Sequence, residues 1–344
     1  MGHTDHLGSS GAIGPASRNI IHAPHRLDIG GTWDLPPLLY FGKRHKPKTL
    51  TIALDIWTKV DIQNNNKQNG HNTIRVSQID QDTYEWSGRL GAHDYTGRVG
   101  LIQSILAFFN IEGAFIDIDI GVPPQIGLGG SGVLSVALVK ACAEFTGTYL
   151  DAIVRIAHDI ENGFFSMTGF QDQMAALAGS GVALWHWDYP PENSIGEEIL
   201  ESQDYHYLED RIVIAIVGRH NSTEINQQQV EAFLTPANRQ GWLDMNNGTT
   251  IAANAIQNHD WKLLVDCIHS EHSFRNKIAP QRIANMEPFI IATKGKSGAF
   301  ATAGAGQAVC WYFSPEVDDI SSIKEEWKDL GADLLPSKIA KPGG

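Results

Sequence analysis

Cysteine is scarce in this sequence, which holds three cysteines among 344 residues. Cys142, Cys267 and Cys310 lie far apart in apolar or helical contexts, so they indicate neither a disulfide framework nor a zinc site. Long apolar runs are also absent. No stretch reaches the roughly 18 residues of a membrane span, and the first twenty residues lack the apolar core of a signal peptide. We therefore expect a cytoplasmic protein whose residues 1–19, rich in Gly, Ser and His, form a disordered leader.

Basic residues are outnumbered, with 26 Lys and Arg against 39 Asp and Glu and a formal net charge of −13. A surplus of negative charge repels nucleic acid and anionic membranes, so neither is expected as a partner. The length suggests about two domains, and hydrophobic residues make up 42% of the chain, enough for a sizeable core. These features agree with a soluble enzyme that acts on a small molecule, as a monomer or a homodimer.

The two commonest nucleotide motifs are absent, because no Gly-Lys-Ser/Thr closes a glycine loop and no G-x-G-x-x-G precedes a suitably spaced acid. Residues 123–132 nevertheless form a glycine-rich turn, Pro-Pro-Gln-Ile-Gly-Leu-Gly-Gly-Ser-Gly. Before it, alternating apolar and acidic side chains at 115–121 predict a half-buried strand. After it, the nearly continuous apolar run at 133–145 predicts a buried helix that starts at Ser131. Such a turn attracts phosphate, so we expect a nucleotide triphosphate there. A tight connection that binds nothing is the alternative.

Three further segments accompany this turn in order along the chain. Residues 23–34 read Ala-Pro-His-Arg-Leu-Asp-Ile-Gly-Gly-Thr-Trp-Asp, residues 169–173 read Gly-Phe-Gln-Asp-Gln, and residues 304–306 read Gly-Ala-Gly. With these four segments the chain resembles the GHMP kinases, whose central motif is P-x-x-x-G-L-G-S-S-A. The segment at 169–173 is similar to G-W-Q-D-Q of the sugar-1-kinase branch, which contains fucokinases and D-glycero-D-manno-heptose kinases.

The chain also departs from the family pattern at several positions. Gly130 and Gly132 stand where the central motif has a serine and an alanine. In the last motif Gln307 and Ala308 replace glycines, and Ala301 occupies the usual place of a lysine. The departures bear on nucleotide binding, the function of both motifs in the family.

The resemblance implies an α+β, two-domain GHMP kinase fold. An S5 domain 2-like N-terminal domain is expected over 20–200 and a ferredoxin-like C-terminal domain over 201–344, since prolines and acids at 189–204 break the pattern. It also implies an ATP- and Mg²⁺-dependent sugar kinase acting on the anomeric hydroxyl of a heptose, heptose phosphate or fucose-like sugar. The alternatives are a non-catalytic sugar- or nucleotide-binding regulatory protein on this fold, and a GHMP enzyme with a non-sugar acceptor.

The resemblance assigns catalysis and metal binding to four residues. Asp172 corresponds to the catalytic aspartate, and Arg26 to the cation beside it. Ser131 and Glu161 correspond to magnesium ligands, Glu161 lying eleven positions before Asp172 as in the superfamily. Each has a plainer alternative. Asp172 or Ser131 could cap a helix, Arg26 could form a structural ion pair, and Glu161 could be an exposed carboxylate at a helix end.

The resemblance also assigns residues to the two substrates. Gly31, Trp33, Asp34 and Gln171 are expected at the sugar, where Trp33 could stack on the ring or could simply lie in the core. The basic run at 42–48 could dock a phosphate of the substrate or could be a solvated loop, which charge runs usually are. The nucleotide is expected at Pro123, Gly127, Leu128, Gly129, Gly130, Ser131, Gly132, Gly304 and Gly306.

Hydrophobic patterning predicts the remaining elements. Strands are expected at 49–62, 114–121, 182–187 and 211–218, with a strand within 299–313. Helices are expected at 133–145, 150–162, 223–233, 242–257, 261–278 and 320–330.

Overall fold

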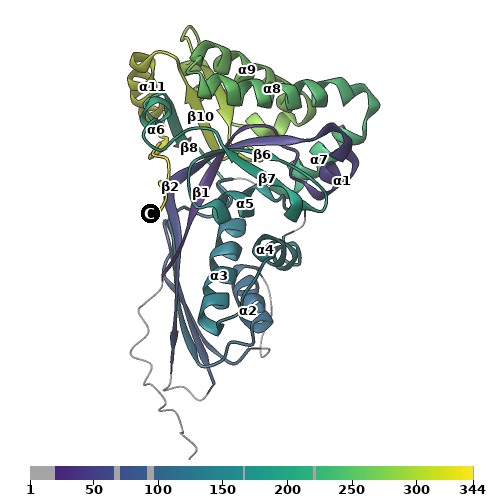
Figure 1. Cartoon of the computed structure of the whole chain (residues 1–344). Helices are drawn as coiled ribbons and strands as arrows, with labels where there is room; N and C mark the ends of the chain where they lie inside the picture. Colours follow the sequence, from purple (N-terminus) through teal and green to yellow (C-terminus); the bar gives the residue numbers. More distant parts are fainter. Residues whose placement is uncertain (1–19, 66–69, 91–96, 166, 220–221, 344) are drawn as a thin grey trace, which may run out of the picture.

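The computed structural model describes residues 20–65, 70–90, 97–165, 167–219 and 222–343. The predicted leader at 1–19 lies outside the described residues. Two β-sheets with helices packed on them make up an α+β structure, as expected (Figure 1). No helix in the described part of the chain is long and apolar enough to cross a membrane.

The larger sheet is built around β2, which pairs with three other strands. Its order is β4-β3-β5-β2-β6-β7, with β1 paired to β2, and every pairing is antiparallel except that of β3 with β5. The isoleucines of β5 are buried while Asp119 is exposed, as the alternation predicted. The strands are β1 (Ile21–Gly30), β2 (Lys48–Asn64), β3 (Asn72–Gln78), β4 (Tyr84–Gly88), β5 (Ala114–Ile120), β6 (Val182–His186) and β7 (Ile195–Glu198).

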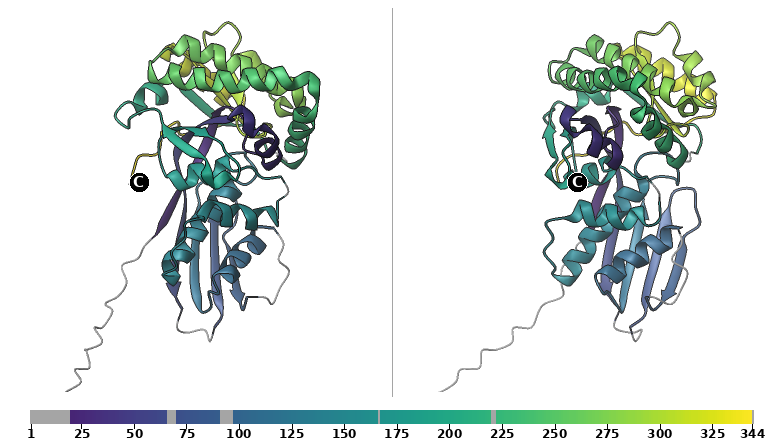
Figure 2. Two further views of the ribbon diagram at one scale, coloured as in Figure 1. Left: turned by 45° about the vertical axis from the view of Figure 1, so that its right-hand side comes forward. Right: turned by 90° about the vertical axis from the view of Figure 1, so that its right-hand side faces the viewer.

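Helices α2 to α5 cover one face of this sheet (Figure 2). The central one, α3, is buried on most sides because its residues are almost all apolar, as its sequence predicted. A loop separates α4 from α5, so Glu161 and Asp172 lie on different helices. The bounds are α2 (Gly97–Phe108), α3 (Gly130–Thr146), α4 (Ile153–Asn162) and α5 (Gln171–Ala178).

The smaller sheet has the order β11-β8-β10-β9 and is wholly antiparallel. Along the chain a strand, a set of helices, a hairpin, a helix and a last strand follow one another, which is the ferredoxin-like arrangement. The elements are β8 (Ile212–Ile216), α7 (Ser222–Leu234), α8 (Arg239–Gln257), α9 (Trp261–Ile278), β9 (Ala299–Thr302), β10 (Val309–Phe313), α11 (Val317–Asp329) and β11 (Asp333–Leu335). The expectation of one strand within 299–313 was incomplete, because Gly304 and Gly306 take positive φ and turn the chain into a hairpin.

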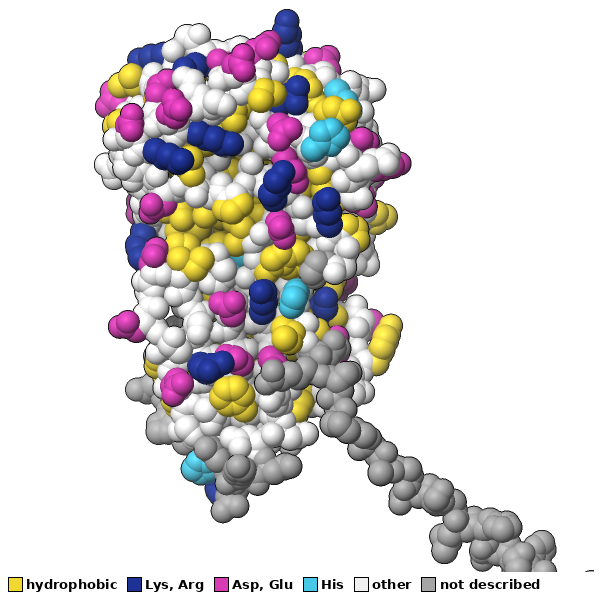
Figure 3. Space-filling model, turned by 90° about the vertical axis from the view of Figure 1, so that its left-hand side faces the viewer, with side chains coloured by type: hydrophobic (Ala, Val, Ile, Leu, Met, Phe, Trp, Pro, Cys, Tyr) yellow, Lys and Arg dark blue, Asp and Glu magenta, His cyan; other side chains and the backbone are white. Residues whose placement is uncertain are grey.

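Short elements complete the structure, and the chain finally returns to the larger sheet. The Ala53 carbonyl accepts the Ala340 N–H at 2.9 Å, and the Ala340 carbonyl accepts the Gly181 N–H at 3.1 Å. Lys338 forms an ion pair with the buried Glu209 at 2.6 Å. On this side of the molecule, charged side chains of both signs surround a group of hydrophobic ones (Figure 3). The short helices are α1 (Pro36–Gly42), η1 (Lys43–His45), η2 (Pro191–Asn193), α6 (Tyr205–Glu209), η3 (Pro236–Asn238), η4 (Pro280–Ile283) and α10 (Glu287–Ala292).

Candidate active site

The glycine-rich turn brings the start of α3 close to α5. Gly129 is the N-cap of α3 with φ of 77°, and a Cβ on it would lie 2.8 Å from Asp172 Cγ. A Cβ on Gly132 would lie 2.7 Å from Asp172 Cβ. The helix begins at Gly130, one residue before the predicted start, so Ser131 is in the first turn and is not the cap. Glycines therefore let the helix N-terminus, with its unpaired N–H groups, approach Asp172.

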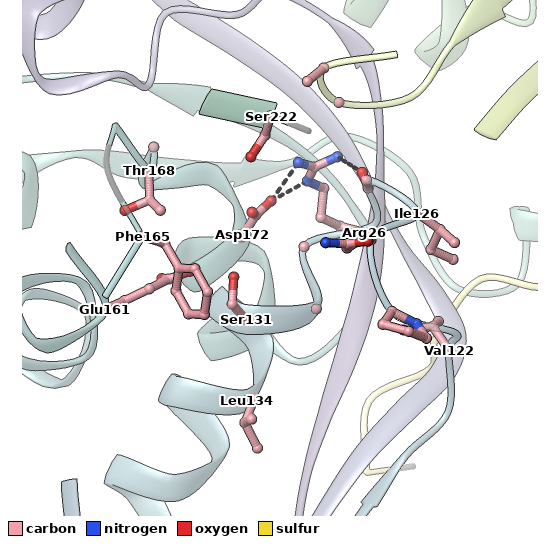
Figure 4. A pocket seen from close by; sticks show the side chains of 18 of the residues that line it. Arg26, Val122, Ile126, Ser131, Leu134, Glu161, Phe165, Thr168, Asp172 and Ser222 are labelled. Atoms are coloured by element: carbon pink, nitrogen blue, oxygen red, sulfur yellow. Dashed lines mark hydrogen bonds and ion pairs between the residues drawn. The ribbon is translucent and has the colours of Figure 1, made fainter. Parts of the chain in front are cut away.

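Asp172 and Arg26 form a short ion pair at the centre of the site (Figure 4). Arg26 comes from β1 and donates from Nε to Asp172 Oδ1 at 2.6 Å, with Nη2 2.5 Å from the same oxygen. Asp172 lies in the first turn of α5, whose N-cap is Phe170, so it is not a cap. Its side chain is 24% exposed and borders a cavity, whereas that of Arg26 is 4% exposed. The pair thus presents one carboxylate to the cavity and holds it with a buried cation.

Glu161 is a buried carboxylate that lines the same cavity next to Ser131 (Figure 4). Burial raises the pKa of Glu161 to about 8, the negative charge of Asp172 adds to this, and hydrogen bonds from Ser131 and Gln173 oppose it. Glu161 is 1% exposed, so the plainer alternative, an exposed carboxylate at a helix end, is wrong. A buried carboxylate and a hydroxyl on one cavity wall are oxygen donors of the kind that Mg²⁺ prefers.

Asp34 lies beside the Arg26–Asp172 pair and hydrogen-bonds the start of α5. Its carboxylate accepts the Gln171 N–H at 3.3 Å, and its backbone carbonyl accepts the Phe170 N–H at 3.3 Å. Any side chain at Gly169 would collide with the Asp34 carboxylate, 1.7 Å from a built Cβ. Burial raises the pKa of Asp34 to about 6, the charge of Asp172 adds to this, and Arg26 opposes it. Asp34 also lines the cavity, where it can accept a hydrogen bond from a ligand.

The expected nucleotide residues divide into two groups. Pro123, Gly127, Gly129, Gly130, Ser131 and Gly304 line the cavity, whereas Leu128, Gly132 and Gly306 are not among the residues that line it. Gly304 packs on the glycine-rich turn so closely that a Cβ on Gly304 would lie 2.7 Å from the Gly127 carbonyl oxygen. The hairpin turn of the smaller sheet therefore completes the wall that the glycine-rich turn begins.

The expected sugar residues also separate. Asp34 and Gln171 line the cavity, and the buried Oε1 of Gln171 has no hydrogen-bond partner within the described part of the chain. Trp33 is 0% exposed and packs edge-on against Phe233 and Trp242, so it lies in the core, the second of the two alternatives. Gly31 is buried with φ of 76°, and a Cβ on it would collide with the Lys48 carbonyl oxygen, so glycine is required here by the backbone conformation.

The cavity has a volume of about 530 Å³ and is lined by residues from the parts of the chain that form each of the two sheets. The smaller sheet and the helices packed on it form the smaller domain. Sequence patterning missed its contribution to the cavity, namely Arg219 and the first turns of α7 with Ser222, Asn226 and Gln229. Gln229 accepts a hydrogen bond from Thr32 at 3.2 Å, which joins α7 to the end of β1. The polar residues at 222–229 were the available signal, but only the tertiary fold shows which of them reach the site.

The basic run at 42–48 lies away from this cavity. Lys43, Arg44 and Lys46 are exposed, and no residue of the run is among those that line the cavity. Lys43 instead lies over the ring of Tyr40, 5.5 Å from its centroid. The placement favours the solvated loop over a phosphate-docking role.

Comparison with known proteins agrees with this geometry. Residues 98–180 match the family model for the GHMP kinases N terminal domain, a range that holds the glycine-rich turn, Glu161 and Asp172. No curated protein matches the sequence.

Solved structures share the fold at low identity. A D-glycero-D-manno-heptose 1-phosphate kinase from Bacteriodes thetaiotaomicron has a TM-score of 0.68 at 18% identity, covering 93% of this chain and 95% of that one. Streptococcus pneumoniae phosphomevalonate kinase, in complex with phosphomevalonate and AMPPNP, has a TM-score of 0.70 at 14% identity, covering 92% and 98%. Methanococcus jannaschii mevalonate kinase has a TM-score of 0.65 at 14% identity, covering 93% and 98%. The expected fold is thereby confirmed.

Proposed function

Because this chain carries a GHMP kinase N-terminal domain and has the GHMP kinase fold, we propose that it is an ATP- and Mg²⁺-dependent kinase that phosphorylates a sugar hydroxyl. The observation that carries the proposal is the Arg26–Asp172 ion pair, set in a cavity against the N-terminus of a glycine-capped helix. Phosphoryl transfer needs cradled phosphates, an oriented hydroxyl and cationic stabilisation, and this arrangement can supply all three.

Asp172 is the proposed acceptor of the proton from the attacking hydroxyl. Arg26 orients the Asp172 carboxylate through two short contacts, and its charge would also stabilise the transferred group. The backbone N–H groups at the start of α3 would bind the phosphates of the nucleotide. Burial of Arg26 strengthens both of its roles, because a charge acts over a longer distance where water is excluded.

Ser131 and Glu161 are the proposed magnesium ligands. The fit is chemical, because a hydroxyl and a carboxylate line one wall and the carboxylate is buried without a cationic partner among the described residues. Magnesium, when bound, would neutralise charge on the nucleotide phosphates. Glu161 would then be held ionised, against the burial that raises its pKa.

A sugar is the proposed acceptor because hydrogen-bonding side chains surround the Asp172 carboxylate. Asp34 and the Oε1 of Gln171, which no described residue partners, can accept from hydroxyl groups, and Asn226 and Gln229 add amides from α7. Arg219 also lines the cavity and has no ion-pair partner among the described residues, so it could bind an anionic group on the acceptor. We therefore favour a heptose or fucose-like sugar, or a heptose phosphate, with the anomeric hydroxyl as the site of transfer.

ADP release with Mg²⁺ and ATP, across a panel of free sugars and sugar phosphates, tests the proposal. Mevalonate and phosphomevalonate complete the panel for the non-sugar alternative. Turnover by the wild type and its loss in Asp172→Asn, with phosphorus NMR assigning the phosphorylated position, is the expected result. No turnover on any acceptor, with ATP failing to bind either protein, would instead favour a non-catalytic regulatory protein. The replacement of family glycines by Gln307 and Ala308 supports that alternative.

A further inference from the structure

A second carboxylate lies behind the catalytic pair and contacts both halves of the molecule. Asp28 is on β1, two residues after Arg26, and its side chain is 0% exposed. Its Oδ1 accepts from Arg26 Nη1 at 3.1 Å and from the Gly304 N–H. Its Oδ2 accepts from Arg275 Nη1 of α9 at 2.9 Å. One buried side chain therefore joins the larger sheet, a helix of the smaller domain and the hairpin turn at the cavity.

The contacts of Asp28 divide the guanidinium of Arg26 into two edges. Nε and Nη2 face Asp172, whereas Nη1 lies between Asp28 and the Gly127 carbonyl oxygen, 3.4 Å away. Without Asp28, this Nη1 would keep only the weak carbonyl contact, and the planar guanidinium could rotate away from Asp172. The orientation of the catalytic pair thus depends on a buried carboxylate that does not line the cavity.

The hairpin turn is held by the same carboxylate. Gly304 is bound at its N–H by Asp28 and at its carbonyl by Arg275 Nη2 at 2.8 Å, while Gly304 itself packs on Gly127. Arg282 Nη2 adds a 3.2 Å hydrogen bond to the same carbonyl. The turn position and the Arg26 orientation are therefore fixed by one network.

We propose that Asp28 is a positioning residue that couples the hairpin turn of the smaller domain to the catalytic Arg26–Asp172 pair. The inference rests on the proposed kinase function for its effect on rate, and on geometry alone for its effect on the turn. Two arginines and a backbone amide surround Asp28, so its loss would release both the turn and the Arg26 edge at once.

Asp28→Asn tests the proposal, with Glu209→Gln as the matched control. Glu209 is also a buried, ion-paired carboxylate, but it binds Lys338 and Ile339 and does not line the cavity. We expect Asp28→Asn to lower kcat by about 10- to 100-fold with the acceptor KM within about threefold, because a displacement of about 1 Å at a reacting group costs about 100-fold. At temperatures below the Tm of the Glu209→Gln variant, this variant should have the kcat of the wild type.

A second variant and a second readout keep the test decisive. Arg275→Lys preserves the charge but not the two-point hold on Asp28 and Gly304, and it should give the same KM-against-kcat split to a smaller extent. In the double variant the two losses should be less than additive. Hydrogen exchange of the peptide containing residues 302–306 should accelerate in Asp28→Asn and not in Glu209→Gln.

The outcomes separate this inference from the proposed function. Absent turnover by the wild type on every acceptor would count against the kinase, while exchange at 302–306 would still support or reject the role of Asp28 in holding the turn. An Asp28→Asn protein with the kcat of Glu209→Gln, or with unchanged exchange at 302–306, would overturn the inference.

Discussion

Replacing Gly132 with alanine tests whether the approach of α3 to α5 sets the position of Asp172. An alanine Cβ at this position would lie 2.7 Å from Asp172 Cβ and 3.2 Å from Gln173 Cδ. Carbon atoms in contact prefer about 3.5–4.0 Å, so α5 must move away by about 1 Å. A shift of about 1 Å at a reacting group costs about 100-fold in rate, and we expect kcat to fall by about that factor.

Stability gives an independent readout of the same crowding. Gly→Ala within a helix ordinarily stabilises by about 1 kcal/mol, whereas overpacking costs about 1–3 kcal/mol. The free energy of unfolding of Gly132→Ala should therefore lie between the wild-type value and about 2 kcal/mol below it. The GHMP central motif has an alanine at this position. Gly130 is the matched control for stability, because a Cβ there would meet no neighbouring protein group within 4 Å. Gly130→Ala should gain up to about 1 kcal/mol, and no prediction is made for its kcat because Gly130 lines the cavity.

The assay is kcat at saturating ATP and acceptor, together with Tm by calorimetry, on the wild type and both variants. The two substitutions add the same methyl group in the same helical turn, so propensity effects cancel in their comparison. A Gly132→Ala protein with the wild-type kcat and a Tm raised as far as that of Gly130→Ala would refute the reasoning, since the added methyl group would then fit without displacing Asp172.

Two further predictions concern charge. The raised pKa of Glu161, about 8, means that the folded protein keeps a proton that the unfolded chain loses from about pH 4.5 upward, so this group's contribution to stability falls as the pH rises from 5 to 8. The Tm of Mg²⁺-free protein should fall over that range more in the wild type than in Glu161→Gln, and equal slopes would contradict the assignment. Arg219→Ala should raise the KM of an anionic acceptor by about tenfold or more and leave that of a neutral sugar unchanged, as loss of a charge-assisted hydrogen bond costs about 1.5–3 kcal/mol. Lys43→Ala with Arg44→Ala, outside the cavity, serves as its control and should change neither KM.

The sequence predicted several elements in which one face or most sides are buried, of which the alternating strand β5 and the apolar helix α3 are clear examples. It gave no prediction for β3, whose buried and half-buried residues also alternate, or for β4 and α2. The strand β1 was missed because it is buried almost throughout and yet contains His25, Arg26 and Asp28, which break any apolar period. The exposed edge strand β7, Ile-Gly-Glu-Glu, was missed because little in its composition favours a strand.

Motif order predicted which residues would meet, but not how they are held. One cavity is lined by Arg26, Ser131, Glu161 and Asp172. Arg26 and Asp172, which form a hydrogen bond, are 146 positions apart in the sequence. The contribution of α7 and the core placement of Trp33 depend on how the smaller domain packs on the larger. Such contacts between distant segments have no local pattern in one sequence.

The return of residues 338–340 to the larger sheet has a consequence for biosynthesis. These residues form backbone hydrogen bonds with Ala53 and Gly181, near the pairing of β2 with β6. The larger sheet is synthesised first, but this part of it is completed only by residues that follow Ala53 by almost 300 positions. Domains generally fold as units in the order of their synthesis. In this chain the N-terminal sheet can assemble early on the ribosome, but it reaches its final pairing only after the exit tunnel has released Ala340. Prematurely terminated chains that end before residue 338 would therefore expose this part of the sheet.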